Sequence, residues 1–264
     1  MKIGCNWSAA LGDLVLDKRV NIDYIKAGAF GEFENQFETM RSLKPVLLHG
    51  LGHFESTGMA DISIVDFNRA NALIKTCSSP HYGTHLDIKN EDMLANMSDE
   101  EIYIRMSTYI QVFKKNISVP LLLENSPDTP QDRVLLDHYP YSEPEKISKL
   151  LIDNDVGLLL DLTHAKVTSE FRNWNIYDYL LGLPLNRVKE IHVNGSGYDE
   201  QGFPADPHKA MEPEDYDLLD WILGYTKPDI ITLEYCGTRS ETREIVIENL
   251  LYQLDKLSIM CQNR

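Results

Sequence analysis

Short apolar runs alternate with longer amphipathic segments along the whole chain. The apolar runs predict eight β-strands. Their expected ranges are 2–6, 23–28, 45–49, 81–86, 119–124, 156–161, 188–193 and 230–235. Several runs, such as Val119 to Leu123 and Val156 to Leu160, are almost wholly apolar. Continuous apolar strands are typical of a parallel sheet that is covered on both faces.

The amphipathic segments between these runs predict helices, because their apolar positions repeat every three or four residues. Their expected ranges are about 11–19, 33–43, 64–77, 99–115, 144–154, 175–182, 213–224 and 240–257. Three helix starts carry the spacing of a capping box, in which a hydroxyl residue precedes glutamate by three positions. These pairs are Ser98 with Glu101, Ser142 with Glu145 and Thr238 with Glu241.

Eight strand–helix units in succession, with no linker or low-complexity stretch, predict a closed (β/α)8 TIM barrel. The length of 264 residues is close to that typical of such barrels. We therefore expect residues 1–264 to form a single domain. The pattern leaves an open, doubly wound sheet as the alternative architecture.

Six of the predicted strands end in a side chain of a type that binds metal ions. They are His49, His85, Glu124, Asp161, His192 and Glu234. Three further candidates follow two of these strands closely: His164, Asp206 and His208. Active sites of (β/α)8 barrels lie at the carboxyl ends of the strands. All nine side chains are therefore expected at the same face of the barrel.

These residue types predict two or three metal sites. The set Glu124, Asp161, His192 and Glu234 suits a divalent ion such as Mn²⁺, Fe²⁺ or Zn²⁺. His49 and His85 could bind a second ion with Glu124 as a bridge, and His164, Asp206 and His208 would complete a third site.

Each of the nine residues also has a plainer interpretation. Asp161, for example, stands where a helix N-cap is common, and a histidine at one strand end is often only a hydrogen-bonded loop residue. Gathering so many carboxylates at one barrel mouth without cations would cost too much free energy, however. Among the remaining histidines, His53 is expected to be a loop residue, and Asn194 to Gly197 to form a turn.

Composition narrows the range of partners. The formal net charge of −16 disfavours a nucleic-acid substrate, since phosphate binding relies on lysine and arginine. No apolar stretch is long enough for a transmembrane span, and the first residues lack a signal-peptide pattern. The four cysteines show no CxxC spacing, so reduced thiols and a cytoplasmic location are expected.

Several of these segments together resemble one family. They are Val46 to Gly52 (VLLHGLG), His85-Leu86, Leu122 to Asn125 (LLEN), Gly157 to Asp161 (GLLLD), Leu183-Pro184, Arg187 to His192 (RVKEIH), Asp206-x-His208 and Thr232 to Glu234 (TLE). The chain is similar to the multinuclear non-haem iron-dependent oxidative enzymes (DUF692 family), within the xylose isomerase-like TIM-barrel superfamily. The matching segments run in family order from about residue 45 to 235.

This resemblance implies a barrel that binds two or three iron ions (Fe²⁺/Fe³⁺), with zinc or manganese as alternatives. It also implies O2-dependent modification of a peptide side chain, often cysteine, with a partner protein that presents the peptide.

One position departs from the family. The family usually has Asp-x-x-Asn where this chain has Asp161-Leu-Thr-His164. Asp-x-x-His is the usual form in the wider superfamily, which includes three-zinc phosphodiesterases of the endonuclease IV type. A zinc- or manganese-dependent hydrolase, or a sugar isomerase or epimerase, is therefore the alternative function.

Overall fold

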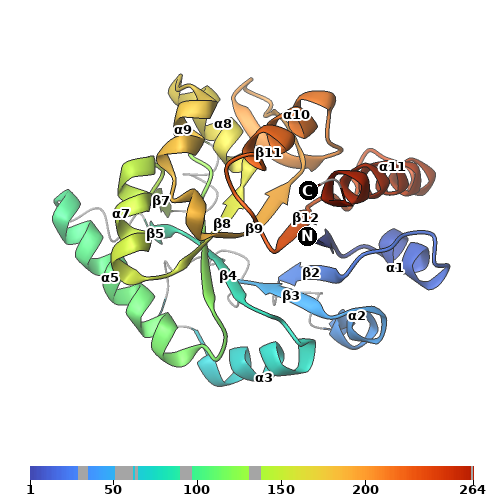
Figure 1. Cartoon of the computed structure of the whole chain (residues 1–264), viewed down its shortest axis with the longest axis horizontal. Coiled ribbons are helices and arrows are strands. Elements are labelled where there is room, and N and C mark those ends of the chain that lie inside the picture. Colours follow the sequence, from blue (N-terminus) through green and yellow to red (C-terminus); the bar gives the residue numbers. More distant parts are fainter. Residues whose placement is uncertain (29–34, 51–61, 63–64, 90–96, 131–137, 263) are drawn as a thin grey trace.

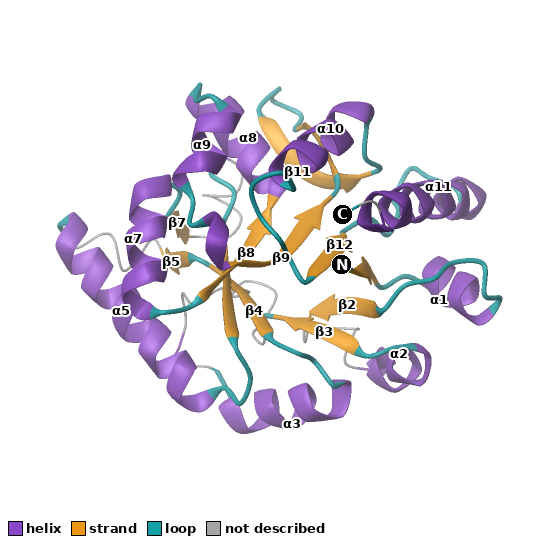
Figure 2. Ribbon diagram, viewed as in Figure 1, coloured by secondary structure: helices purple, strands orange, loops and turns teal. Residues whose placement is uncertain are grey.

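Eight parallel strands close into a barrel surrounded by helices (Figures 1 and 2), which confirms the predicted architecture and excludes the open sheet. The computed structural model describes residues 1–28, 35–50, 62, 65–89, 97–130, 138–262 and 264. His53 and the predicted starts of the helices at 33 and 64 lie outside these residues. No helix in the described part of the chain has the length and apolar character needed to cross a bilayer.

The barrel strands follow one another around the ring in the order β1-β12-β9-β8-β6-β4-β3-β2. Their bounds are β1 Lys2–Asn6, β2 Tyr24–Gly28, β3 Val46–His49, β4 Tyr82–His85, β6 Leu121–Glu124, β8 Gly157–Asp161, β9 Val188–Val193 and β12 Ile230–Leu233. Each lies within two residues of its predicted bounds, because near-continuous burial gives these strands a strong apolar signal.

The helices form the outer ring of Figure 1. They are α1 Ala9–Leu16, α2 Phe37–Leu43, α3 Phe67–Cys77, α5 Asp99–Asn116, α7 Pro144–Asn154, α8 Leu162–Arg172, α9 Ile176–Gly182, α10 Pro213–Ile222 and α11 Arg243–Gln262. The capping box of Ser98 and Glu101 is confirmed at the start of α5. The one expected from Ser142 is wrong, because α7 begins after Glu143 and Pro144 occupies its first turn.

The sequence did not predict α8. This helix begins directly at the end of β8, and the residues of its first turn are buried, so it lacks the amphipathic pattern of a surface helix. Two small antiparallel sheets were also missed: β5 (Asp87–Lys89) with β7 (His138–Pro140), and β10 (Gly195–Tyr198) with β11 (Pro204–Lys209). The segment at Asn194 to Gly197, which was expected to form a turn, is therefore largely strand, and Asp206 and His208 belong to β11.

Inside the barrel, side chains alternate between inward and outward positions along each strand. In β9, the outward Ile191 packs in the main hydrophobic core, while Glu190 and His192 are inward and buried. Tyr24, Leu47 and Ile230 form a small separate apolar cluster towards the amino ends of their strands. The apolar contacts of this small cluster thus lie at the end of the barrel opposite to the ligand-type residues at the carboxyl ends of the strands.

Candidate metal centre

The central cluster lies at the carboxyl ends of β6, β8, β9 and β12. It consists of four buried residues with one ligand-type atom each, all within 4.8 Å of one another: Glu124, Asp161, His192 and Glu234. Strand register contributes to this arrangement, since Asp161 pairs with His192 between β8 and β9. His192 Nδ1 lies 2.9 Å from Glu124 Oε1 and 3.4 Å from Glu234 Oε2.

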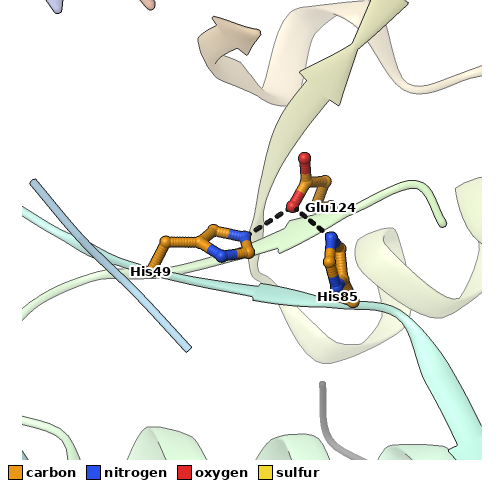
Figure 3. Close-up of side chains that lie close together, drawn as sticks. All are labelled: His49, His85 and Glu124. Carbon is orange, nitrogen blue, oxygen red and sulfur yellow. Dashed lines mark hydrogen bonds and ion pairs between the residues drawn. The ribbon is translucent and has the colours of Figure 1, made fainter. Parts of the chain in front are cut away.

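A second cluster shares Glu124 with the first and adds His49 and His85 (Figure 3). Both Nε2 atoms approach the same oxygen, Glu124 Oε2, at 2.5 Å from His49 and 3.0 Å from His85. Gly83 pairs with His49 in the sheet and leaves room for its ring, because a Cβ there would lie 2.9 Å from His49 Cδ2. Glu124 thus directs one oxygen towards each cluster.

The carboxylate of Asp161 also has two separate roles. Its Oδ1 accepts a hydrogen bond of 2.6 Å from the backbone N–H of His164 and caps α8, as the plainer interpretation of the sequence required. Its Oδ2 is buried and receives no hydrogen bond among the described residues. The side chain of Asn125 holds the Asp161 backbone through two hydrogen bonds of 2.9 Å, so this free oxygen is fixed in place.

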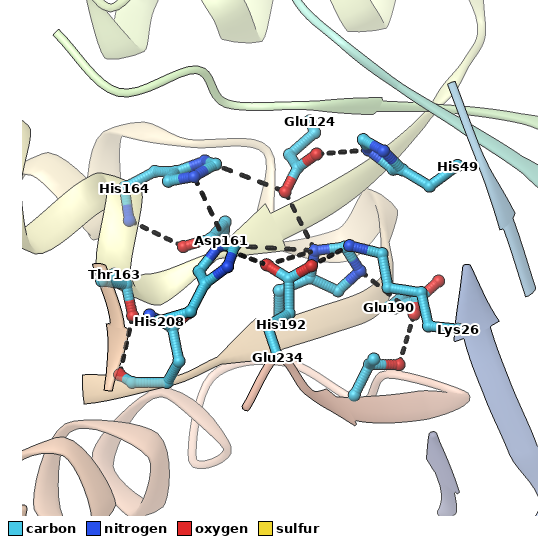
Figure 4. A network of polar contacts seen from close by, with 12 residues as sticks. Lys26, His49, Glu124, Asp161, Thr163, His164, Glu190, His192, His208 and Glu234 are labelled. Atoms are coloured by element: carbon cyan, nitrogen blue, oxygen red, sulfur yellow. Dashed lines mark hydrogen bonds and ion pairs between the residues drawn. The ribbon is translucent and has the colours of Figure 1, made fainter. Parts of the chain in front are cut away.

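A third cluster combines Asp161 with His164 from α8 and Asp206 from β11. His164 Nδ1 lies 2.9 Å from the carbonyl oxygen of Asn125, and its Nε2 lies 3.2 Å from Asp206 Oδ2. His208 is outside the three clusters but adjoins them (Figure 4), with Nε2 3.4 Å from Asp206 Oδ2 and 3.9 Å from Glu234 Oε2. The structure therefore brings all nine predicted residues to one basin, with His208 at its edge.

Three residues of this network were missed at the sequence level. Lys26 of β2 is buried and its Nζ donates to Glu234 Oε1 (Figure 4). Glu190 Oε1 lies 3.2 Å from His192 Nε2, on the side of the ring away from the carboxylates, and His81 Nε2 lies 2.5 Å from Glu190 Oε2. The one local signal was the spacing of Glu190, two positions before His192 on the same face of an otherwise buried strand. A lysine near a strand end gives no comparable signal.

The basin perturbs the pKa values of its residues in opposite directions. Burial lowers the pKa of His49 to about 3, despite the opposing charge of Glu124. Burial would raise the pKa of Glu124, but the imidazoles of His85, His49 and His192 outweigh it and hold that pKa well below its usual value. Burial raises the pKa of Asp161, and the negative charges of Asp206 and Glu124 act in the same direction.

His164 behaves differently from His49. Burial opposes its protonation, but the negative charge of Asp161 and a hydrogen bond with Asp206 outweigh burial and raise its pKa to about 10. His49 is thus uncharged near pH 7, whereas a cation at the third cluster must displace a proton from the charged His164.

The donor set fits a group of divalent transition-metal ions. Four carboxylates converge with five imidazoles, and burial of the carboxylates is costly unless cations neutralise them. In the described part of the chain, Lys26 is the one lysine or arginine paired with this group. Asp161 Oδ2, which is buried and accepts no hydrogen bond from the described residues, is an atom that a bound cation would satisfy.

Comparisons with known proteins identify the family of this chain. A sequence model of the family described as "RiPP precursor modification enzyme MbnB/TglH/ChrH" matches residues 3–251. A UPF0276 protein of Acaryochloris marina is 27% identical over 185 residues, covering 64% of this chain and 64% of that protein. A UPF0276 protein of Bordetella pertussis is 30% identical over 151 residues, covering 55% of this chain and 51% of that protein. The matches thus span between half and two thirds of these relatives.

Among solved structures, a putative xylose isomerase from Rhodospirillum rubrum superimposes with a TM-score of 0.65. The match covers 98% of this chain and 99% of the other, at 16% sequence identity. At this identity the likeness concerns the fold, which is therefore that of the xylose isomerase-like barrels.

Proposed function

Because this chain belongs to the MbnB/TglH/ChrH family of RiPP precursor modification enzymes, we propose that it is an O2-dependent oxidoreductase with two or three iron ions as its cofactor. Its substrate would be a ribosomally made peptide or a small thiol compound, and a partner protein would present the peptide in the cytoplasm. The observation that carries this proposal is the overlap of the three clusters, which share Glu124 and Asp161. Shared carboxylates suit neighbouring ions rather than one isolated ion.

The ligand assignment follows the clusters. His49, His85 and Glu124 would bind one ion, and the central cluster would bind its neighbour. His164, Asp206 and His208 would bind a third ion or contact the substrate. When bound, iron would supply electrons to O2 and a binding position for a substrate thiolate.

The chain's own residues enclose this basin unevenly. On the β2 side, the buried ammonium of Lys26 pairs with Glu234 and offsets part of the negative charge. On the β11 side, His208 is the most exposed of the nine side chains, at 43%. We therefore place the approach of the substrate on the β11 side, where a side chain of the basin reaches solvent.

His164 favours a second candidate, a zinc- or manganese-dependent phosphodiesterase of the AP-endonuclease type. Its imidazole completes the third cluster with Asp161 and Asp206, as the Asp-x-x-His pattern of those enzymes requires. A sugar isomerase or epimerase would need the central cluster alone, which leaves His49 and His85 without a role.

Anaerobic purification followed by metal analysis and Mössbauer spectroscopy tests the proposal. We expect two or three irons per chain, and O2-dependent mass loss or gain in a Cys-containing peptide encoded beside the gene and co-expressed with it. Stoichiometric zinc, no O2 consumption and turnover of a phosphodiester would instead establish the second candidate. The Glu124→Gln variant serves as the negative control, since it should lose both the bound iron and the peptide modification.

A further inference from the structure

A buried line of polar side chains extends from the central cluster towards the amino-terminal end of the barrel. Glu190 and His192 stand two residues apart in β9 and face the interior together, each 1% exposed. His192 Nδ1 faces the carboxylates of the basin, while its Nε2 lies 3.2 Å from Glu190 Oε1 (Figure 4). The two ring nitrogens of His192 therefore have different environments.

The partner of Nε2 determines what Nδ1 can do. A carboxylate only accepts hydrogen bonds, so Glu190 requires a proton on His192 Nε2. A neutral imidazole with its proton on Nε2 has its lone pair on Nδ1, and a cation in the central cluster would replace the proton that Nδ1 otherwise shares with Glu124 Oε1 at 2.9 Å. Metal-binding histidines commonly donate their other N–H to a carboxylate or carbonyl group, which fixes the tautomer and the ring orientation.

Glu190 is itself held from two sides. His81 Nε2 lies 2.5 Å from its Oε2, and the hydroxyl of Thr232 donates to its Oε1 at 2.5 Å. Thr232 pairs with His192 in the register of β9 and β12, which places it beside the Glu190–His192 contact. His81 lines a cavity of about 670 Å³ at the amino-terminal end of the barrel, together with Tyr24 and Ile230. Glu190, His81 and Thr232 thus form a polar clamp on His192, and the clamp extends from that cavity to the basin.

We propose that Glu190, held by His81 and Thr232, is a positioning residue that presents Nδ1 of His192 to a metal ion in the central cluster. The inference rests on the proposed function only in requiring that this cluster binds metal. A purely structural role predicts something different: loss of Glu190 would lower the stability of the metal-free protein but leave metal binding per folded chain unchanged.

The test compares Fe²⁺ binding by wild type, Glu190→Leu and Glu190→Gln, titrated anaerobically against a competing chelator. Leucine has no acceptor for His192 Nε2, so Glu190→Leu should lose about 10- to 100-fold in affinity for one ion. The amide oxygen of glutamine can still accept this hydrogen bond, so Glu190→Gln should recover most of the loss. The site formed by His49, His85 and Glu124 should fill normally in both variants.

Thr232→Val tests the clamp more gently and has a matched control. It removes the hydroxyl donor to Glu190, so it should weaken Fe²⁺ binding by less than Glu190→Leu does. Thr226→Val removes another buried hydroxyl, which donates to the carbonyl of Leu185 away from the basin. Thermal unfolding of the metal-free proteins should show similar losses for both threonine variants, whereas only Thr232→Val should change Fe²⁺ affinity.

Two results would overturn the inference, and they are distinguishable. A folded Glu190→Leu protein with wild-type Fe²⁺ affinity at every site would refute the positioning role and leave the proposed function intact. A wild-type protein that binds no metal ion would refute both. Should Glu190→Leu not fold, ¹⁵N NMR of histidine in Zn²⁺-loaded wild type decides: a proton on His192 Nε2 supports the inference, and a proton on Nδ1 refutes it.

Discussion

The ligands at the barrel strand ends and those of the β10–β11 hairpin are held with different firmness. Glu124, Asp161 and His192 lie at the ends of strands bonded on both sides within the closed barrel, and their side chains are at most 1% exposed. Asp206 and His208 lie in a two-stranded sheet, where the backbone of His208 has a φ of +50° and its side chain is 43% exposed. The barrel thus provides preorganised ligands, whereas the hairpin supplies an adaptable one, His208, beside the buried Asp206.

This difference predicts that the metal ions bind with different affinities. Ligands that burial and strand pairing already fix lose little conformational entropy when an ion binds, so the strand-end ions should bind tightly. The half-exposed His208 must become ordered on binding, and His164 must release a proton, so the ion nearest the hairpin should bind more weakly. The weaker position is the one at which a substrate could replace a ligand.

The largest expected effect belongs to Glu124→Gln. Glu124 belongs to two clusters, so the loss of its charge should remove metal ions from both. Activity should fall by more than about 100-fold, which exceeds the usual effect of mutating a residue that only hydrogen-bonds to a metal ligand. Metal analysis, turnover and circular dichroism of the purified variant measure this. Glu145→Gln, on the exposed surface of α7, is the control and should match wild type. Full metal content in Glu124→Gln would contradict the bridging role.

An intermediate effect concerns acid stability of the metal-free protein. In the unfolded chain His49 binds a proton near pH 6.5, whereas in the folded protein it does so only near pH 3. The unfolded state therefore binds more protons in this window, and stability falls as pH drops through it, by up to roughly 1.4 kcal/mol per pH unit. Glu124, whose pKa is lowered, adds a loss of the same sign at the acid end of this range.

Urea unfolding of the chelator-treated protein from pH 7 to pH 4 measures this slope. Because glutamine does not titrate, the unfolding free energy of His49→Gln should fall less steeply with decreasing pH than that of wild type. If the unfolding free energies of the two proteins changed equally with pH, His49 would not be the group responsible. The strand-end ligands would then be less buried than we infer from their contrast with the hairpin.

The smallest effect is expected from His208→Ala. Since this side chain is half-exposed and outside the three clusters, its removal should change the stability of the metal-free protein by no more than about 0.5 kcal/mol. It should weaken only the most loosely bound ion, by about 10-fold. Stepwise metal titration measures both quantities when combined with thermal unfolding. Loss of two ions would show that the hairpin is as integral to the basin as the strand ends are.

Much of this protein could be predicted from its sequence. The eight barrel strands are recognisable because burial on both faces makes them apolar along their length, and six of the nine ligand-type residues stand at or beside their ends. Parallel strands in a barrel all end at the same face, so convergence of these residues followed from the architecture. His164, Asp206 and His208 were found from their proximity to such ends, although the elements that hold them, α8 and β11, were not.

The tertiary structure alone decided which polar side chains meet inside the barrel. Lys26 and Glu234 are 208 positions apart, and His81 and Glu190 are 109 apart. Lys26 and His81 look ordinary in their own segments, because local hydrophobic patterning records whether a position is buried, not which residue it will contact. Only closure of the sheet, which joins β1 to β12 and fixes the register of every strand, turns these separate residues into a basin and the clamp beneath it.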